Sequence, residues 1–396
     1  MKRLVLLLVV ALALATPAQA VQKNIVVKKL DRAIAAPDAE LLVLSGSSII
    51  TISNTDAMNS NIVLNAVDAS GAQQWQKTID SGVDEVAMSA SVDTAGNIWL
   101  AGFSAEKVIV ETATAPVVAE NPDSVPIEAV QQLRGDSNQL TVWKISPVGD
   151  VLATYLSPQD IPGLISAISV NGTGVSIVGH IHDSPFVQTM TSAGTFGKVI
   201  QIGTSKTTFS AVVRNSDGST SIFGSSSEAL AKKKLAGVRD GILMKVSKTG
   251  VITSLVRSSA IKGDRSWISA DSSLLLSGYV KTGKVIETAV TKFSSTFVPS
   301  WTIRIPSNGA SAAIATGVTT YAALGSRAAI NNVIGWKPTG IQFLLLGFDS
   351  KGLISNAYGS TELSYPISIT YSKELGIVGL AKATDGSTSI FKLANR

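Results

Sequence analysis

The sequence predicts an all-β chain in which one four-stranded unit is repeated around a closed ring. Residues 163–205 hold four short segments rich in Val, Ile, Thr and Phe, separated by the turn sequences NGTG, DSP and AGTFG. A third-strand pattern recurs seven times, and a glycine recurs near the end of the second strand in six of the units. Together these observations predict a seven-bladed β-propeller of four-stranded antiparallel blades.

The two repeated patterns locate the units independently. The variable position of the third strand recurs after an interval of 79 residues and then at intervals of 45 to 56 residues, at Asn65, Lys144, Thr189, Lys245, Lys292, Gly347 and Lys392. A glycine inside a strand indicates a β-bulge or a close backbone approach. The six glycines of the second strand are Gly102, Gly179, Gly224, Gly278, Gly325 and Gly379.

The last unit lacks a fourth strand, because the chain ends at Arg396, shortly after Lys392. The segment Asn24–Leu30, NIVVKKL, precedes the first unit and has no partner of its own. We expect this N-terminal strand to complete the last blade and so to cover its open edge.

The first twenty residues have the pattern of a signal peptide. Lys2 and Arg3 precede the apolar run Leu4–Ala15, and Ala18-Gln19-Ala20 forms a small-residue cleavage site. We therefore expect residues 1–20 to be a signal peptide and 21–396 to form a single propeller domain with an insertion at 104–139. The expected location is secreted, cell-surface or periplasmic, and no later stretch is long and apolar enough to span a membrane.

The composition excludes several classes of function. The 396 residues include no Cys, which excludes disulfides, thiolate metal sites and a Cys nucleophile. The signal segment contains two basic and no acidic residues, so the remainder carries 31 basic and 28 acidic residues. This small excess of basic residues is not typical of a nucleic-acid-binding protein. No motif indicates a cofactor, and we expect a monomer.

Several segments resemble a known group of repeats. The copies ILMKVSKTGVI and VLNAVDASGAQQWQKTI, with IWLAGF and SIVGHI, resemble bacterial secreted seven-bladed propellers of the bead or SBBP-repeat type, and more distantly quinoprotein-like repeats. Quinoprotein repeats carry a Trp at the end of each blade, and Trp75 and Trp301 stand in comparable places. The resemblance implies the fold; it implies no quinone site and no particular activity.

One face of the ring is the candidate functional face. In an up-and-down meander the connections between second and third strands lie on the same face as the links between blades. The long segments Ser104–Gln139, Ser225–Asp240 and Ser326–Gly340 are all connections of this kind. Long loops on a rigid ring commonly carry function. Helix formers between a capping Ser and a Gly predict short helices at Ser124–Gly135 and Ser226–Gly237.

The only two histidines lie together at the end of the third unit's second strand. Strand alternation places the imidazoles of His180 and His182 on one side, and Asp183 could complete or orient a metal site. The alternative is a polar strand end that hydrogen-bonds to its surroundings, and no spacing indicates a third ligand.

Other polar residues of the long connections are candidates for ligand contacts. The basic and aromatic side chains suit a sugar or an anion, although a buried ring that anchors its loop explains Trp336 slightly better. The candidates are Arg239, Arg327, Trp336 and Lys337. A pair of carboxylates at a suitable separation could hydrolyse a glycosidic bond. The candidate carboxylates are Glu106, Glu111, Glu120, Asp123, Glu128, Asp136, Glu228 and Asp240.

These observations lead to two functional hypotheses. The first is an exported propeller that acts as a rigid binding scaffold for a glycan, a peptide or a partner protein. The alternative is an extracellular polysaccharide hydrolase or lyase that uses loop carboxylates or the pair His180 and His182. The sequence favours the first hypothesis and assigns no catalytic residue.

Overall fold

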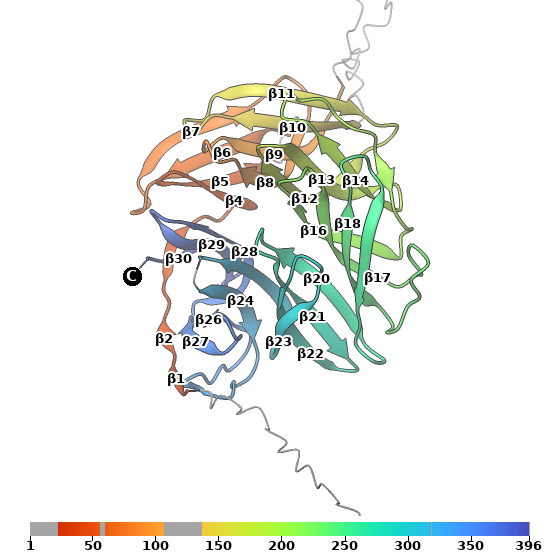
Figure 1. The fold of residues 1–396 in the computed structure, drawn as a ribbon. Helices are drawn as coiled ribbons and strands as arrows, with labels where there is room; N and C mark the ends of the chain where they lie inside the picture. Colours follow the sequence, from red (N-terminus) through yellow and green to blue (C-terminus); the bar gives the residue numbers. More distant parts are fainter. Residues whose placement is uncertain (1–22, 56–59, 107–136, 318, 396) are drawn as a thin grey trace, which may run out of the picture.

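The computed structural model describes residues 23–55, 60–106, 137–317 and 319–395, and these residues form strands and connections without a helix. The sheets are arranged around a ring (Figure 1), with the first strand of each sheet near its middle. In the four-stranded sheets the first strands contact one another in succession, β20 and β23 of the eight-stranded sheet continue the series to β28, and the contact between β28 and β4 closes the ring. None of the described segments is a helix long and apolar enough to cross a membrane.

Five sheets are separate, antiparallel and four-stranded. The first contains β4 (Leu41–Ser45), β5 (Ser48–Asn54), β6 (Ile62–Val67) and β7 (Gln73–Ile79). The second contains β8 (Glu85–Val92), β9 (Ile98–Ser104), β10 (Gln139–Ile145) and β11 (Val151–Pro158). The third contains β12 (Gly163–Asn171), β13 (Gly174–Ile181), β14 (Ser184–Met190) and β15 (Ile200–Gln201).

The fourth sheet contains β16 (Thr207–Arg214), β17 (Thr220–Ser226), β18 (Asp240–Val246) and β19 (Ile252–Ser258). The last contains β28 (Leu363–Ser372), β29 (Gly376–Ala383), β30 (Thr388–Leu393) and β3 (Arg32–Ala35). Buried apolar residues lie between successive sheets: one cluster joins Phe103 of β9 to Phe186 of β14, and another joins Phe223 of β17 to Trp267 of β20.

Eight of the remaining strands form one sheet, and β1 (Ile25–Val26) and β25 (Val333–Ile334) form a separate two-stranded sheet. The members of the eight-stranded sheet, in spatial order, are β2 (Lys28–Lys29), β27 (Ile354–Gly359), β26 (Gln342–Phe348), β24 (Thr320–Ser326), β23 (Pro299–Ala315), β22 (Val285–Phe293), β21 (Leu275–Thr282) and β20 (Asp264–Ala270). The prediction of seven separate blades is therefore wrong, because the described residues form five separate four-stranded blades and this larger sheet.

The long strand β23 is the physical reason for the difference. It pairs with β22 up to Pro306 and with β24 from Ser307 onward, so one continuous strand belongs to two hairpins. The sequence Pro306-Ser-Asn-Gly309 resembles a break between units. In the structure Gly309 has φ +96° within an irregularity of the pairing, and the chain bends there without leaving the sheet.

The N-terminal segment closes the ring differently from the prediction. β3 pairs antiparallel with β30 and supplies the outermost strand of the last blade. The expected segment Asn24–Leu30 lies elsewhere: β1 (Ile25–Val26) pairs in parallel with β25 (Val333–Ile334), and β2 pairs in parallel with β27. Leu30 is buried and its amide donates to the Gly359 carbonyl at 2.8 Å. The segment thus covers the outer edge of the eight-stranded sheet.

The glycines of the second strands mark close backbone approaches. A Cβ on Gly102, Gly179, Gly224 or Gly278 would lie 1.8 or 1.9 Å from a carbonyl oxygen of the first strand. Each of these glycines pairs beside a bulge of that first strand. Gly325 differs, because it meets the Asn308 side chain instead.

A single kind of turn recurs on one face of the ring, which we call the tight-turn face. In nine turns of this face the amide of the first residue donates to the carbonyl of the fifth, and the amide of the fourth donates to the carbonyl of the first; a tenth turn of this kind, at residues 383–387, lies on the opposite face. The first residues all have short polar side chains, and several of these accept amide hydrogens within the turn. They are Asp68, Asp93, Ser146, Thr191, Asn215, Ser247, Asp271, Ser294 and Asp349.

The fourth residue of several of these turns contacts a large aromatic side chain from a strand of a neighbouring hairpin. In all nine turns the fourth residue has positive φ, and it is Gly in seven turns, Leu274 in one and Phe297 in another. A Cβ on Gly149 would lie 2.9 Å from Trp75, and one on Gly352 would lie 2.6 Å from Trp301. A Cβ on Gly194 would lie 2.0 Å from Tyr155. Trp75 and Tyr155 come from the last strand of one sheet and pack on a turn of the next sheet, whereas Trp301 of β23 packs on the turn between β26 and β27 of its own eight-stranded sheet.

Candidate functional site

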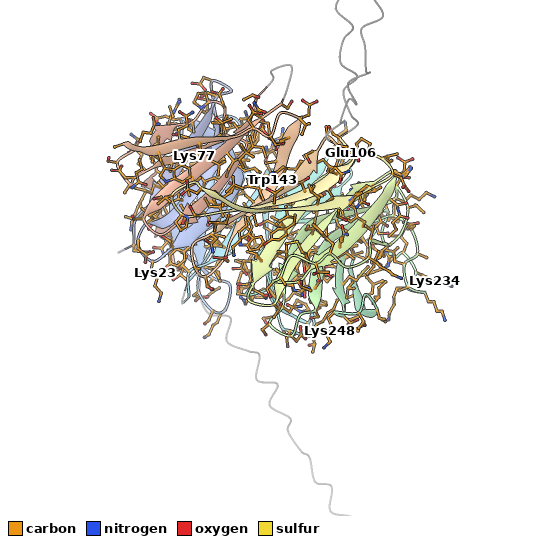
Figure 2. The ribbon with its side chains drawn as sticks, turned by 90° about the horizontal axis from the view of Figure 1, so that it is seen from above. Lys23, Lys77, Glu106, Trp143, Lys234 and Lys248 are labelled. Atoms are coloured by element: carbon orange, nitrogen blue, oxygen red, sulfur yellow. The ribbon has the colours of Figure 1, made fainter. Side chains whose placement is uncertain are left out.

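The opposite face, which we call the insertion face, carries the long connections. These connections are hydrogen-bonded to the links between successive sheets: the Ser227 amide donates to the Lys206 carbonyl at 2.9 Å, and the Val238 amide donates to the Gly263 carbonyl at 3.0 Å. Glu106 of this face and Lys248 of the tight-turn face lie on opposite sides of the molecule (Figure 2). The described connections are thus held on the ring by backbone hydrogen bonds.

A buried ion pair lies where the connection 227–239 joins β18. Arg257 Nη1 of β19 lies 3.3 Å from Asp240 Oδ2, and the two side chains are 7% and 0% exposed. Asp240 also accepts the amides of Ala236 at 3.0 Å and Gly237 at 2.8 Å. Burial raises the pKa of Asp240. Hydrogen bonds from Ser259 and from those two amides lower it, as does the charge of Arg257, and the net effect is a lowered pKa.

A second carboxylate holds the start of the same connection. Glu228 accepts the Thr204 amide at 2.7 Å and the Thr207 hydroxyl at 2.6 Å, and its carbonyl accepts from Arg257. Burial raises the pKa of Glu228, and the hydrogen bonds from Thr207 and Thr204 lower it further than burial raises it. Glu228 and Asp240 are therefore charged groups whose oxygens are already used to position the loop. This arrangement suits a structural role better than acid–base chemistry.

The expected helix at Ser226–Gly237 does not form. Leu230 and Lys233 instead make an isolated two-residue bridge, and Ala231 and Lys232 have φ +43° and +64°. A helix this short is marginal without tertiary support. Here Leu230 is buried against the ring and Glu228 is bonded to Thr204, which fixes a turn in place of the helix. The other expected helix, Ser124–Gly135, lies outside the described residues.

A largely buried guanidinium lies between the fourth sheet and the eight-stranded sheet. Arg265 stacks on Trp267 with 4.4 Å from Cζ to the ring centroid, and its Nη2 lies 3.5 Å from Thr291 Oγ1. Burial lowers the pKa of Arg265 to about 10, and Arg304 contributes in the same direction. Arg304 itself pairs with Glu287 at 2.5 Å. Arg265 remains charged at neutral pH and contributes positive charge beneath this part of the insertion face.

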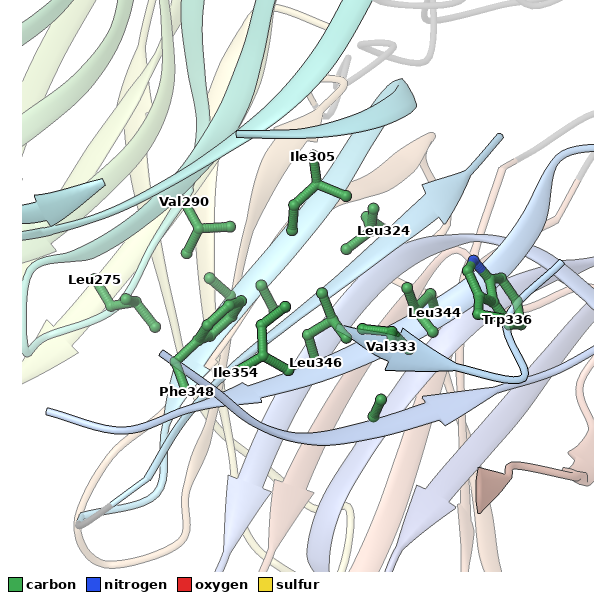
Figure 3. Close-up of a cluster of buried hydrophobic side chains, with 13 residues drawn as sticks. Leu275, Val290, Ile305, Leu324, Val333, Trp336, Leu344, Leu346, Phe348 and Ile354 are labelled. Carbon is green, nitrogen blue, oxygen red and sulfur yellow. The ribbon is translucent and has the colours of Figure 1, made fainter. Parts of the chain in front are cut away.

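The connection 327–341 is anchored by a buried aromatic ring. Trp336 is 5% exposed, its Nε1 donates to Ser326 Oγ at 2.9 Å, and it packs in a cluster with Val333 and Leu344 (Figure 3). The anchoring role considered from the sequence is therefore the one that the structure supports. Arg327 and Lys337 lie beside this anchor, partly or fully open to solvent.

The histidines and their neighbours do not form a cluster. His180 Nε2 lies 3.2 Å from the Thr207 carbonyl, at the boundary between the third and fourth sheets. His182 lies beyond the end of β13 in a turn with φ +53°, so the strand alternation expected for the pair does not extend to it. His182 and Asp183 are exposed. Within the described ranges no three His, Asp or Glu side chains are placed to hold a metal ion.

The structure brings some predicted residues together and leaves others apart. Asp240 belongs to the network of Glu228 and Thr207, and the Thr207 carbonyl also contacts His180. Arg239, in the connection 227–239, donates to Ser225 Oγ of β17 at 3.3 Å. Arg327, Trp336 and Lys337 belong to the separate connection, and Glu106 is exposed at the end of the described part of its own. The carboxylates expected at Glu111, Glu120, Asp123, Glu128 and Asp136 lie outside the described residues.

Sequence reasoning missed Arg257 and Arg265. Arg257 lies on β19 at a position where an exposed strand face could also carry an arginine. The local sequence therefore does not indicate that its side chain is buried. Arg265 directly precedes the core residues Ser266 and Trp267, and this Arg-x-Trp spacing on one strand face is the available signal for stacking.

Comparison with known proteins supports the fold. No family model matches the chain, and no curated protein matches it. The chain is similar to the β-propeller domain of Cps50 (Swd1) from Myceliophteria thermophila, with 10% identity and a TM-score of 0.53 over 92% of this chain and 99% of that domain. It is also similar to a chain of the Mitotic Checkpoint Complex, with 12% identity and a TM-score of 0.51 over 100% of both chains. At these identities the likeness shows the β-propeller fold alone.

Proposed function

We propose that this protein is an exported β-propeller that binds a partner protein through its insertion face. The observation that supports the proposal is the difference between the two faces: one carries nine copies of the same short turn, whereas the described connections of the other differ in length and are hydrogen-bonded to the ring. A surface that is ordered before binding loses little conformational entropy on association. The resemblance to bead or SBBP-repeat propellers remains part of this proposal.

The connection 327–341 is the best candidate for the main contact. It presents Arg327, Ile334 and Lys337 around the buried Trp336, and Ile334 is 49% exposed. Ile334 pairs in register with Val26 of β1, which is 63% exposed, so two aliphatic side chains lie on adjacent strands. An arginine beside exposed apolar groups on a rigid support is typical of the residues that dominate binding energy in protein interfaces.

Affinity capture from the native exported fraction tests this proposal. We expect the double variant Arg327→Ala with Ile334→Asp to bind a captured partner at least tenfold more weakly, because residues of these types contribute about 1.4 kcal/mol or more when they are central to an interface. The matched control is Lys351→Ala with Val298→Asp on the tight-turn face, where Val298 is 60% exposed. A partner that is lost equally from both variants, or from neither, would refute the proposal.

The alternative hypothesis of a polysaccharide hydrolase receives less support from the geometry. Glu228 accepts a hydrogen bond from Thr207 of the ring, Asp240 accepts one from the Gly237 amide of the loop, and His180 contacts a backbone carbonyl. A glycan-array screen followed by a hydrolysis assay on the bound glycans separates the remaining possibilities. Glycan binding without cleavage would support the binding-scaffold hypothesis, with a glycan instead of a protein as the ligand.

A further inference from the structure

One sector of the insertion face combines positive charge with exposed aliphatic side chains. We call it the basic patch and define it as residues 203–206, 227–239, 259–265 and 281–285. These segments carry nine basic residues and two acidic ones, Glu228 and Asp264. The basic residues are Lys206, Lys232, Lys233, Lys234, Arg239, Lys262, Arg265, Lys281 and Lys284. All seven lysines are exposed, and Lys234 projects from the body of the ring (Figure 2).

The four segments form one surface. The Ser227 amide donates to the Lys206 carbonyl, and the Val238 amide donates to the Gly263 carbonyl. A Cβ on Gly263 would lie 2.7 Å from the Lys281 carbonyl oxygen, which brings the fourth segment against the third. The charges therefore belong to neighbouring loops of the same face.

Each of three adjacent loops also exposes one aliphatic side chain beside a basic residue. Val238 is 58% exposed next to Arg239, Ile261 is 88% exposed next to Lys262, and Val285 is 60% exposed next to Lys284. Ile261 has the highest exposure among the large apolar residues that the structure describes as exposed. No aromatic residue occurs in these segments.

The turns of the opposite face do not share this excess of lysine. The nine turns of the tight-turn face contain six aspartates and two lysines. Some of these aspartates lie close to lysines of neighbouring strands, as Asp150 does to Lys77 and Asp217 does to Lys245. An anionic surface would therefore attract the basic patch more strongly than the tight-turn face.

We infer that the basic patch docks on an anionic membrane surface, with Val238, Ile261 and Val285 entering the interfacial layer and the lysines contacting lipid headgroups. Aliphatic side chains flanked by lysines are the combination that holds proteins at a lipid interface. Protein interfaces are instead depleted in lysine and enriched in aromatic residues, which the patch lacks. The inference does not depend on the proposed partner, because it concerns a different set of loops.

Vesicle sedimentation tests the inference. We expect the purified protein to bind vesicles of equal parts phosphatidylglycerol and phosphatidylcholine and not to bind vesicles of phosphatidylcholine alone. It should dissociate from the anionic vesicles in 0.5 M salt, because the screening length then falls to a few Å. The variant Ile261→Ser is expected to lower the partition coefficient about tenfold, because one isoleucine no longer enters the interface. The variant Lys284→Glu is expected to lower it at least fivefold.

The control variants are Val251→Ser and Lys248→Glu on the tight-turn face, where Val251 is 60% exposed. Residues 1–22 are the same in every variant, so differences between them cannot arise from that segment. Failure of the wild type to bind, equal binding to both vesicle types, or equal losses in the control variants would overturn the inference. Binding to a polyglutamate peptide without binding to anionic vesicles would also overturn it, and would assign the patch to an acidic protein segment.

Discussion

Replacing Asp240 by Asn should destabilise the fold far more than removing an exposed carboxylate of similar geometry. The substitution leaves Arg257 charged and buried without its carboxylate partner. Breaking a buried pair in this way costs about 3 to 5 kcal/mol. The Asn oxygen can still accept one of the two amides of residues 236 and 237, and Arg257 keeps its contact with the Glu228 carbonyl. We therefore expect a loss of about 3 kcal/mol in the free energy of unfolding, at the lower end of that range.

The control is Asp150→Asn, because Asp150 lies 3.5 Å from Lys77 and both side chains are exposed. Exposed pairs contribute about 0 to 1 kcal/mol. Urea unfolding at pH 7, with unchanged slopes, measures both variants. Rescue by Asp240→Asn combined with Arg257→Met would identify the unpaired charge as the cause. A loss for Asp240→Asn no larger than that for Asp150→Asn would refute the reasoning.

The same pair predicts a dependence on pH. The pKa of Asp240 is lowered in the folded state, so its carboxylate stabilises the fold above the unfolded pKa of about 4. This contribution is lost as the pH falls through the folded pKa. The difference in stability between the wild type and Asp240→Asn should stay constant from about pH 5 to 8 and shrink below about pH 4.

Three further substitutions or deletions test the packing of the ring. Phe297→Gly suits the positive φ of its turn but removes a ring that is 3% exposed and packs on Phe223, so we expect a net loss of about 2 to 4 kcal/mol in urea unfolding. Gly352→Ala should destabilise by at least about 1 kcal/mol, because its Cβ would lie 2.6 Å from Trp301; an unchanged midpoint would refute that contact. Deleting residues 23–35 should lower the melting temperature by more than deleting 23–30, because only the longer deletion also uncovers β30; equal melting temperatures would contradict this.

Part of the fold follows from local sequence. The turn sequences from Asp68 to Gly71 and from Asp349 to Gly352 determine their own hydrogen bonds, so the hairpins that they close are predictable from the residues of the turns alone. The close backbone approach expected at Gly102 and its counterparts is likewise a local property of the strand. Gly325 departs from it because it lies opposite the irregular stretch between Ser307 and Ser311, where the Asn308 side chain fills the space.

The parts that could not be predicted depend on contacts between distant segments. Local sequence does not identify which N-terminal strand closes the last blade, since β2 and β3 are both short and both contain basic residues, and the pairing is determined by their distant partners β27 and β30. The loop 227–239 has the composition of a helix, but its shape is set by Asp240 and Glu228 bonding to the ring. The buried state of Arg257 likewise depends on that loop.

The shared strand β23 limits how this molecule can be rearranged. New chain ends introduced at a tight turn, such as 247–251, would leave every sheet complete, whereas a cut between residues 306 and 310 would divide a strand that serves two hairpins at once. A copy of the repeat could be inserted or excised elsewhere as a module. On this side of the ring two hairpins would have to be gained or lost together.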